Sequence, residues 1–226
     1  LKSNIDEAVI KRGIEHGLDE ISTKYVKVDE IPFDFSRRRL SIIVNDGTKT
    51  QLITKGAVEE ILNICTLVDY KGKVEPITNS IKENIKKITK ELNKQGLRVV
   101  AVCQKNDLNK TEEFNVSDEK NMVLIGFIGF LDPPKETAKS SIEKLGKNGI
   151  RVIVLTGDNV EVTRCVCDKV GIKSNRIVTG PQIDKLADQG LKRLLKKTNI
   201  FAKLSPIQKA RIVRLLRDNG NVVGYM

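Results

Sequence analysis

The sequence predicts a chain of α/β and α+β character, in which a mixed antiparallel part precedes a parallel part. Strand hairpins alternate with covering helices over residues 1–131, which is typical of an α+β layer. From residue 150 onward, short apolar strands alternate with helices, which indicates βαβ units and a parallel sheet. Leu131-Asp132-Pro133-Pro134 separates the two patterns, because consecutive prolines continue neither a strand ladder nor a helix. We therefore expect two domains, residues 1–131 and 132–226.

The first domain is expected to open with an amphipathic helix over about residues 5–16. Two strands, Arg39–Val44 and Thr48–Thr54, follow and are joined through Asn45-Asp46-Gly47. Asp-Gly between β-branched runs is a strong hairpin signal. A second hairpin is predicted around the turn at residues 69–72, and it ends at Pro76.

A longer helix and a strand are expected next. Ser80 and Glu83 have the spacing of a capping box, which predicts a helix that runs to about Gln95. Gly96 ends this helix, and Leu97–Val102 reads as a buried strand. Residues 105–121 are polar and charged, so we expect a surface loop there.

The second domain is expected to contain four short strands and three helices from residue 150 onward. The predicted strands are Ile150–Leu155, Arg176–Thr179, Asn199–Ala202 and Val222–Tyr225, and the predicted helices are Val160–Val170, Ile183–Lys197 and Pro206–Arg217.

Composition limits the classes of function. Lys and Arg number 40 against 29 Asp and Glu, a net charge of +11, which favours polyanionic partners such as nucleic acid, nucleotide phosphates or an acidic membrane face. The longest apolar run, Met122–Leu131, is about half of the ~20 residues that span a bilayer. His16 is the only histidine and lies where a helix is expected to end, so it is expected to be solvated, and mechanisms that need several histidines are excluded.

The four cysteines do not form a metal or disulfide pattern. None of them has CxxC spacing, which argues against zinc ribbons and thioredoxin motifs and favours a reducing compartment.

Thr156-Gly157-Asp158 is a candidate anion site. It follows the strand that ends at Leu155 and precedes a helix, and ligands in open α/β sheets bind beyond the carboxyl ends of strands. A hydroxyl and backbone N–H groups at a helix N-terminus attract anions, and Gly157 allows close approach of the backbone. The alternative is an ordinary turn in which Thr156 or Asp158 caps the helix.

Lys209 is a second candidate. Ser205 can cap the helix that Pro206 begins, and Lys209 follows one turn later, near the same strand-end crevice as Thr156. Its alternative role is that of one solvated lysine among many.

Two further motifs lie in the first domain. Lys55-Gly56 closes a strand and could place an ammonium in a phosphate or purine pocket; the alternative is a turn glycine beside a surface lysine. Phe33 to Arg39 combines aromatic rings with arginines, as nucleotide and single-stranded nucleic-acid sites do. Because only 4% of the chain is aromatic, core packing is the expected alternative for either phenylalanine, Phe33 or Phe35.

In order along the chain, these motifs resemble the P-type cation-transporting ATPases, and the resemblance covers nearly the whole sequence. The residues that carry it are Asp6-x-Ala8, Phe33 with Arg37-Arg38-Arg39-Leu40-Ser41, Lys55-Gly56-Ala57, Leu97-Arg98, Leu131-Asp132-Pro133-Pro134, Thr156-Gly157-Asp158, and Phe201 with Pro206-x-x-Lys209. Four stretches look like the bacterial magnesium-transporting members: Asp29–Ser41, Gln95–Val102, Leu131–Thr137 and Asn221–Met226.

The resemblance implies a nucleotide-binding domain over residues 1–131 that is inserted into a phosphorylation domain. Residues 132–226 would be the C-terminal, incomplete portion of that second domain, a haloacid-dehalogenase-like Rossmannoid parallel sheet. The implied ligands are ATP or ADP and Mg²⁺, as Mg-ATP. The implied nucleotide contacts are Phe33 on adenine, Asp6 near the adenine amino group, Lys55 and Gly56 in the pocket, Arg38 as its cation, and Arg98 at the phosphates.

In the second domain, the resemblance implies that Thr156 and Gly157 hold the transferred phosphoryl group and that Lys209 neutralises it. Asp158 and Asp132 match acidic residues that flank the nucleotide and the hinge. Positioning and charge neutralisation carry most of the work in phosphoryl transfer.

The sequence also departs from the family pattern. Neither the Asp-Lys-Thr-Gly-Thr motif, which holds the nucleophile, nor the Gly-Asp-Gly-x-Asn-Asp motif occurs in it. We therefore expect an inactive cytoplasmic-side fragment of a longer, multi-pass pump of the cell membrane, whose partners are the membrane and actuator domains. The alternatives are a pump for another cation such as calcium, a basic nucleic-acid-binding module, and a free-standing phosphatase, which the missing nucleophile disfavours.

Overall fold

A computed structural model describes residues 4–106, 108 and 113–225. The chain divides into two compact units, and each is described by itself. The first unit comprises Leu1–Thr89 and Val99–Phe130, and the second comprises Lys90–Arg98 and Leu131–Met226.

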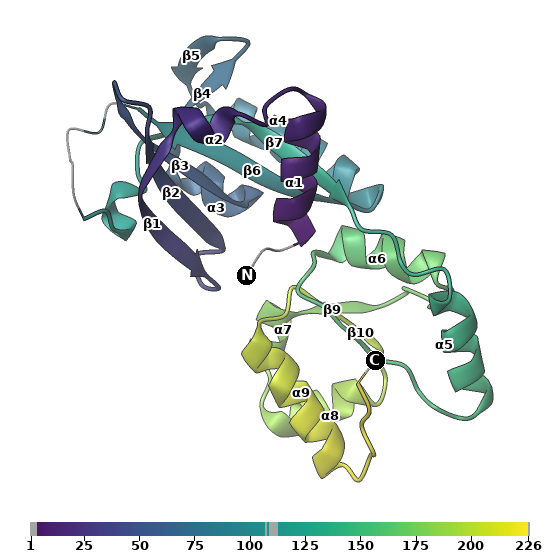
Figure 1. Cartoon of the computed structure of the whole chain (residues 1–226). Coiled ribbons are helices and arrows are strands. Elements are labelled where there is room, and N and C mark those ends of the chain that lie inside the picture. The colour runs from purple at the N-terminus through teal and green to yellow at the C-terminus, as the bar shows by residue number, and fades with distance from the viewer. Residues whose placement is uncertain (1–3, 107, 109–112, 226) are drawn as a thin grey trace. The chain divides into compact units, whose positions relative to one another are not determined.

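The first unit is built on a mixed sheet of seven strands in the order β1-β2-β3-β6-β7-β4-β5 (Figure 1). Its strands are β1 (Val26–Asp34), β2 (Arg39–Asn45), β3 (Thr50–Ala57), β4 (Cys65–Tyr70), β5 (Lys73–Pro76), β6 (Leu97–Lys105) and β7 (Met122–Leu131). The helices around it are α1 (Asn4–Glu15), α2 (Ile21–Lys24), α3 (Val58–Ile64) and α4 (Asn79–Lys94), and Val116–Asp118 form a short 3-10 helix, η1. Strands β1, β2, β3 and β6 pair antiparallel in that order, whereas β4 pairs parallel with β7.

One face of this sheet carries the core. Ile43, Leu52 and Cys103 are fully buried and cluster with Ile61 of α3 and Ile85 of α4. Side chains alternate between the faces of a strand, so the neighbours of these residues on β2, β3 and β6 point to the opposite face. On that opposite face most of these neighbours are half-buried, although Val44 and Gln51 are buried.

Both predicted hairpins are confirmed. In the β2–β3 turn, the carboxylate of Asp46 accepts hydrogen bonds from the N–H groups of Thr48 and Lys49, each 2.9 Å long. Gly47 has a φ of +88°, a conformation that glycine adopts at no steric cost. The predicted first helix and the strand that begins at Leu97 are also confirmed.

The predicted capping box at Ser80 is wrong. Helix α4 begins at Asn79, and the hydroxyl of Thr78 accepts a hydrogen bond from the N–H of Ile81 at 3.2 Å. Ser80 is exposed within the first turn. A capping residue lies before the helix, where its side chain reaches the free N–H groups, and Thr78 occupies that position.

Replacing Thr78 with Ala is therefore expected to lower the free energy of unfolding by about 0.5–1 kcal/mol, the usual loss at a helix N-cap. Ser80→Ala is the matched control and is expected to change stability by less than about 0.3 kcal/mol, because an exposed surface change has little effect. Urea unfolding of both variants measures the difference. A larger decrease in the free energy of unfolding for Ser80→Ala than for Thr78→Ala would indicate that Ser80 caps the helix after all.

The predicted surface loop over residues 105–121 is wrong in part. Phe114 is 8% exposed and belongs to the core, and Glu119 is 3% exposed. Positions 107 and 109–112 of this stretch lie outside the described residues. The polar composition of residues 105–121 predicted exposure, but Glu119 is buried because it pairs with the cationic residues described below.

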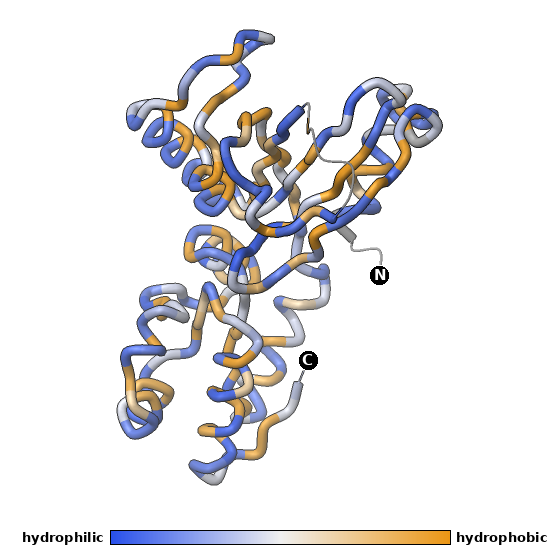
Figure 2. The backbone as a smooth tube through the Cα atoms, turned by 90° about the vertical axis from the view of Figure 1, so that its left-hand side faces the viewer, coloured by the Kyte–Doolittle hydropathy of each residue, from blue (hydrophilic) through white to orange (hydrophobic). Residues whose placement is uncertain are grey.

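The second unit contains a parallel sheet of three strands in the order β8-β10-β9, which confirms the predicted parallel pairing. Its strands are β8 (Val154–Leu155), β9 (Ile177–Thr179) and β10 (Ile200–Ala202), and its helices are α5 (Ala138–Lys147), α6 (Val160–Lys169), α7 (Gly180–Asp184), α8 (Asp188–Leu195) and α9 (Pro206–Asp218). Phe201 on the central strand is fully buried with Ile183, Leu191 and Ile212. Hydrophobic and hydrophilic residues alternate along the helices, as expected where one helix face is buried (Figure 2).

Four details of the second unit differ from the prediction. The strand expected from Ile150 consists only of Val154 and Leu155, because β10 is short and pairs with those two residues alone. The helix expected over Ile183–Lys197 is two helices: Thr179 and Gln182 form a capping box that starts α7 early, and α8 begins anew at Asp188.

No strand forms at Val222–Tyr225, where the side chains of Val222 and Tyr225 are fully exposed and no described strand pairs with the segment. Helix α5 had not been predicted. The remaining predicted helices and strands of this unit are confirmed within one residue at each end.

Other expectations concern single residues. His16 is exposed after the end of α1, as predicted. All four cysteines are free thiols. Among the described residues, no helix has the length and apolar character that crossing a bilayer requires.

Candidate functional site

Strand β3 carries the first group of predicted site residues on the half-buried face of the sheet. Thr54 points into the core, so Lys55 points to the other face, where its ammonium forms an ion pair with the carboxylate of Asp6 on α1. The two side chains are 38% and 36% exposed. The pair is therefore accessible to a ligand while it fixes the position of both charges.

Phe33 lies on β1, two strands away from Lys55. The pairing of Ile31 with Ser41 and of Asp34 with Arg39 leaves Pro32 and Phe33 in a bulge opposite Leu40, and Leu40 pairs with Lys55. The ring of Phe33 is 52% exposed and contacts that of Phe35 edge-on, with centroids 5.2 Å apart and an interplanar angle of 88°. Phe35 is 68% exposed, so the expectation of core packing is wrong for both rings.

Arg38 and Gly56 meet where β2 and β3 approach each other. Arg38 is exposed, has a φ of +49°, and its carbonyl accepts a hydrogen bond from the N–H of Ala57 at 3.0 Å. A Cβ on Gly56 would lie 2.6 Å from both the carbonyl oxygen of Arg38 and the Cβ of Arg39. Gly56 is thus required for strand packing, and its neighbours Lys55 and Arg38 are brought to one end of the sheet.

Sequence reasoning missed the buried carboxylate of this region, Glu119. Its side chain is fully buried and accepts hydrogen bonds from Nη1 of Arg37 at 2.8 and 2.9 Å, from Nε of Arg39 at 2.7 Å and from the hydroxyl of Ser41 at 2.7 Å. Burial raises the pKa of Glu119, but these hydrogen bonds lower it by more, so the pKa lies below the usual glutamate range. No local signal in the sequence could have found this network, because Glu119 lies about 80 positions after the arginines that bind it.

Two of the three clustered arginines therefore have a structural role. Arg37 and Arg39 point to Glu119 on the core side, and their side chains are only 18% and 12% exposed. Arg38, between them, remains the exposed cation of the cluster.

The second group of predicted residues lies at the carboxyl ends of β8 and β10. The N–H of Thr156 donates to the carbonyl of Phe201 at 3.0 Å, and the N–H of Lys203 donates to the carbonyl of Asp158 at 2.7 Å. Lys203, which was not among the predicted site residues, has a φ of +53°, a conformation that costs energy for a residue with a side chain. The two loops are thus bound to each other beyond the strand ends.

Asp158 is held by several groups. Its carboxylate accepts hydrogen bonds from the hydroxyl of Thr156 and from Nη2 of Arg98, both at 3.0 Å, and Arg98 also forms an ion pair with Asp132 at 3.2 Å. Helix α6 is capped by Asn159, whose side chain accepts from the N–H of Val162 at 2.9 Å. The alternative in which Thr156 or Asp158 caps this helix is therefore wrong.

Gly157 and Lys209 complete the second group. A Cβ on Gly157 would meet only the carbonyl of Leu204, at an ordinary 3.5 Å, so packing within the chain does not require glycine there. Ser205 and Gln208 form the capping box of α9, as the sequence predicted for Ser205, and Lys209 follows in the first turn. Lys209 is half-buried and has no ion-pair partner among the described residues.

Comparison with known proteins decides the family. The family model described as "P-type ATPase, cytoplasmic domain N" matches residues 3–137. The chain belongs to the P-type ATPase family.

Relatives of the chain are described as cation-transporting ATPases. The chain is 42% identical to "Magnesium-transporting ATPase, P-type 1" of Escherichia coli K12 over its whole length, and 37% identical to a protein of the same description from Salmonella typhimurium over 98% of its length. It is 30% identical to "Calcium-transporting ATPase 1" of Bacillus cereus over 91% of its length. The chain spans about a quarter of the length of these relatives.

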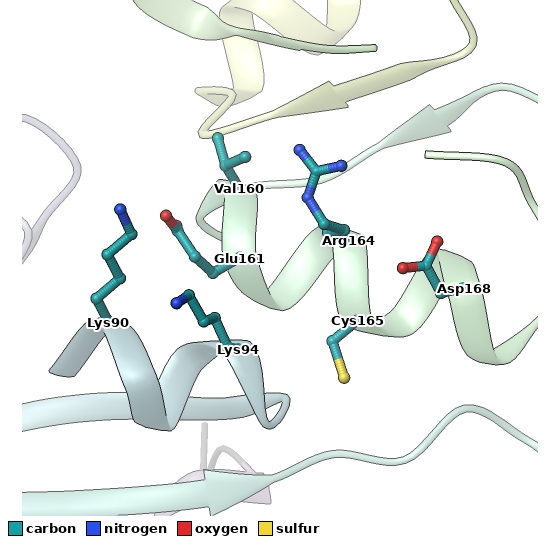
Figure 3. Close-up of a pocket in the computed structure, with 7 residues that line it drawn as sticks. All are labelled: Lys90, Lys94, Val160, Glu161, Arg164, Cys165 and Asp168. Carbon is teal, nitrogen blue, oxygen red and sulfur yellow. The ribbon is translucent and has the colours of Figure 1, made fainter. Parts of the chain in front are cut away.

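A hollow of about 370 Å³ in the second unit of this P-type ATPase chain contains none of the predicted site residues. It lies between Lys90 and Lys94 of α4 and the α6 residues Val160, Glu161, Arg164, Cys165 and Asp168 (Figure 3). Its three cations are accompanied by two carboxylates, and Arg164 donates to the carbonyl of Ser174 at 2.8 Å.

Proposed function

We propose that this chain is the ATP-binding segment of a P-type ATPase that couples ATP hydrolysis, through an aspartyl-phosphate, to magnesium transport. The observation that carries the proposal is the Asp6–Lys55 ion pair at the end of the sheet that also presents the exposed ring of Phe33. Within the part that matches the nucleotide-binding domain of the family, these residues combine an aromatic face, a cation and a carboxylate. An adenine nucleotide has a group that complements each of these: its base can stack on the aromatic face, its phosphates can pair with the cation, and its amino group can donate to the carboxylate.

In this proposal each residue of the first unit has a separate task. Phe33 stacks on adenine, Asp6 accepts from the adenine amino group, and Lys55 and Arg38 attract the negatively charged nucleotide. Gly56 keeps the two strands close enough for Lys55 and Arg38 to share one end of the sheet. The exposure of Phe33 supports its role, since a ring that packs in the core offers no face to a base.

The second unit is proposed to be the C-terminal portion of a haloacid-dehalogenase-like phosphorylation domain. Thr156, the backbone at Gly157 and Lys209 would hold and neutralise the transferred phosphoryl group, with Asp158, Asp132 and Arg98 beside the nucleotide. Their positions beyond the carboxyl ends of parallel strands support this, as do the space at Gly157 and the absence of an ion pair on Lys209 among the described residues.

The remaining parts of the reaction are assigned to the full-length pump. We propose that its phosphorylated aspartate, its actuator domain and its membrane domain lie outside this chain, and that this chain alone does not turn over ATP. Magnesium is proposed as the cargo because the relatives of 42% and 37% identity are described as magnesium transporters, whereas the described calcium transporters are 30–31% identical.

Replacing Lys55 with Ala tests the proposed pocket. Loss of one charge-assisted contact should weaken ATP binding by about 1.5–3 kcal/mol, about 10- to 150-fold in the dissociation constant. Lys105→Ala is the matched control, because Lys105 is a half-buried lysine of the neighbouring strand β6 that pairs with Leu52 on the opposite face of the sheet. Fluorescence titration with a labelled ATP measures both. Equal affinities for the two variants would remove Lys55 from the site.

A further inference from the structure

The turn that joins β1 to β2 begins just after Phe33, which lies near the end of β1, and is tightly organised. The carboxylate of Asp34 accepts hydrogen bonds from the N–H groups of Ser36 at 2.7 Å and Arg37 at 2.9 Å, and from the hydroxyl of Ser36. The carbonyl of Asp34 accepts from the N–H of Arg38 at 2.7 Å. Hydrogen bonds from the following residues to the Asp34 carboxylate fix the shape of the turn. They lie within the turn and do not attach it to the rest of the unit.

Arg37 attaches the turn to the interior of the unit, in addition to the backbone hydrogen bond from the N–H of Ala57 to the carbonyl of Arg38. Its Nη2 donates to the carbonyl of Pro32 at 2.8 Å, and its Nη1 donates to both carboxylate oxygens of Glu119 at 2.9 and 2.8 Å. Pro32 directly precedes Phe33. One guanidinium therefore ties the backbone next to the exposed ring to a residue 82 positions away in the sequence.

Glu119 is in turn held firmly. Besides Arg37, it accepts from Arg39 and Ser41, and the hydroxyl of Ser41 lies 2.7 Å from that of Thr54 on β3. Its side chain is fully buried. Burying a carboxylate is costly, and a fully satisfied buried network of this kind fixes geometry more than it adds stability.

We propose that Glu119 and Arg37 form a latch that positions Phe33 for stacking on the adenine ring, without contact between either residue and the nucleotide. This inference rests on the proposed function. Glu119 acts through Arg37 and Arg37 acts through the Pro32 carbonyl, so both are positioning residues. Phe33 is 52% exposed and is contacted by Phe35 only edge-on, so little packing fixes the direction of the ring without the latch.

The first test is a double-mutant cycle of Arg37→Lys and Phe33→Ala, read as ATP affinity of the 226-residue chain. A lysine keeps the charge beside Glu119 but lacks the rigid fork that reaches Glu119 and Pro32 together. Arg37→Lys is expected to weaken ATP binding about fivefold in the original chain and less than about twofold when Phe33 is already Ala, because residues that act through one another are not additive. Equal losses in both backgrounds, or no loss in the original chain, would overturn the proposal.

The second test measures the turn itself and needs no nucleotide. Hydrogen exchange of the Ser36, Arg37 and Arg38 amides is expected to accelerate about tenfold or more in Arg37→Lys, because loss of the latch allows local opening, while exchange in α9 stays unchanged. Arg12→Lys is the control, since the side chain of Arg12 forms an exposed ion pair with Glu15 at 3.0 Å. If Arg37→Lys does not fold, Glu119→Asp, which shortens the carboxylate arm, replaces it in both tests.

The two proposals fail differently. If the unsubstituted chain does not bind ATP, the proposed function falls and the stacking role of the latch falls with it. If the chain binds ATP but Arg37→Lys leaves affinity and amide exchange unchanged, the positioning role alone is overturned.

Discussion

Glu119→Gln is expected to lower the free energy of unfolding by about 3 kcal/mol or more, because removing one partner from a buried ionic network leaves the others uncompensated. The substitution preserves the shape of the side chain but leaves Arg37 and Arg39, 18% and 12% exposed, without their counter-charge. Denaturant unfolding measures the loss.

Glu30→Gln is the matched control for this prediction. Glu30 forms an exposed ion pair with Lys27 at 2.5 Å, and such surface pairs contribute about 0–1 kcal/mol. A loss for Glu119→Gln as small as that of the control would show that the buried network does not stabilise the first unit.

The pKa of Glu119 predicts how the free energy of unfolding of the original chain and of Glu119→Gln differs with pH. The pKa of Glu119 is lowered in the folded chain, so the stability it contributes is complete above the unfolded pKa of about 4.3 and is lost as pH falls through the folded pKa. The difference between the original chain and Glu119→Gln should therefore be constant near neutral pH and shrink below about pH 4.

Phe33→Ala is expected to weaken ATP binding by about 1–3 kcal/mol, about 5- to 150-fold in the dissociation constant, the range measured for base stacking on aromatic side chains. The ring is half exposed, so its loss should change the free energy of unfolding little. A shift in affinity with unchanged stability is the signature of a ligand contact, and titration of ATP together with urea unfolding measures both quantities.

Tyr70→Ala is the control for Phe33→Ala. Tyr70 is an aromatic residue of the same unit, 64% exposed, and lies in the β4–β5 hairpin at the opposite edge of the sheet from β1. Its substitution should leave ATP affinity unchanged. If the two substitutions weaken binding equally, the effect does not come from stacking on Phe33.

Local signals in the sequence predicted much of the fold because they are decided by a few neighbouring residues. Asn45-Asp46-Gly47 specifies its own turn through the Asp46 carboxylate and the positive φ of Gly47. Ser205 likewise caps α9 as expected, since its partner Gln208 lies three residues later. The parallel pairing of β8, β9 and β10 followed from the alternation of strands and helices.

Features that depend on distant residues could not be predicted in this way. Glu119 is buried only because Arg37, Arg39 and Ser41 converge on it from about 80 positions earlier in the chain. Strand β8 has two residues because β10 pairs with only those two. Residues 222–225 form no strand, and Val222 and Tyr225 are exposed. The apolar character of a segment does not show whether another strand pairs with it. The ion pair between Asp6 and Lys55 is likewise set by how α1 lies on the sheet.

Calorimetric titration of ATP into the folded 226-residue chain tests the central claim most directly. We expect saturable heat with one site per chain, and at physiological salt an oligonucleotide should not displace the nucleotide, although the chain carries a net charge of +11. Absence of saturable heat at millimolar ATP, or complete displacement by the oligonucleotide with a steep dependence on salt, would contradict the assignment of this chain as the nucleotide-binding segment of a pump.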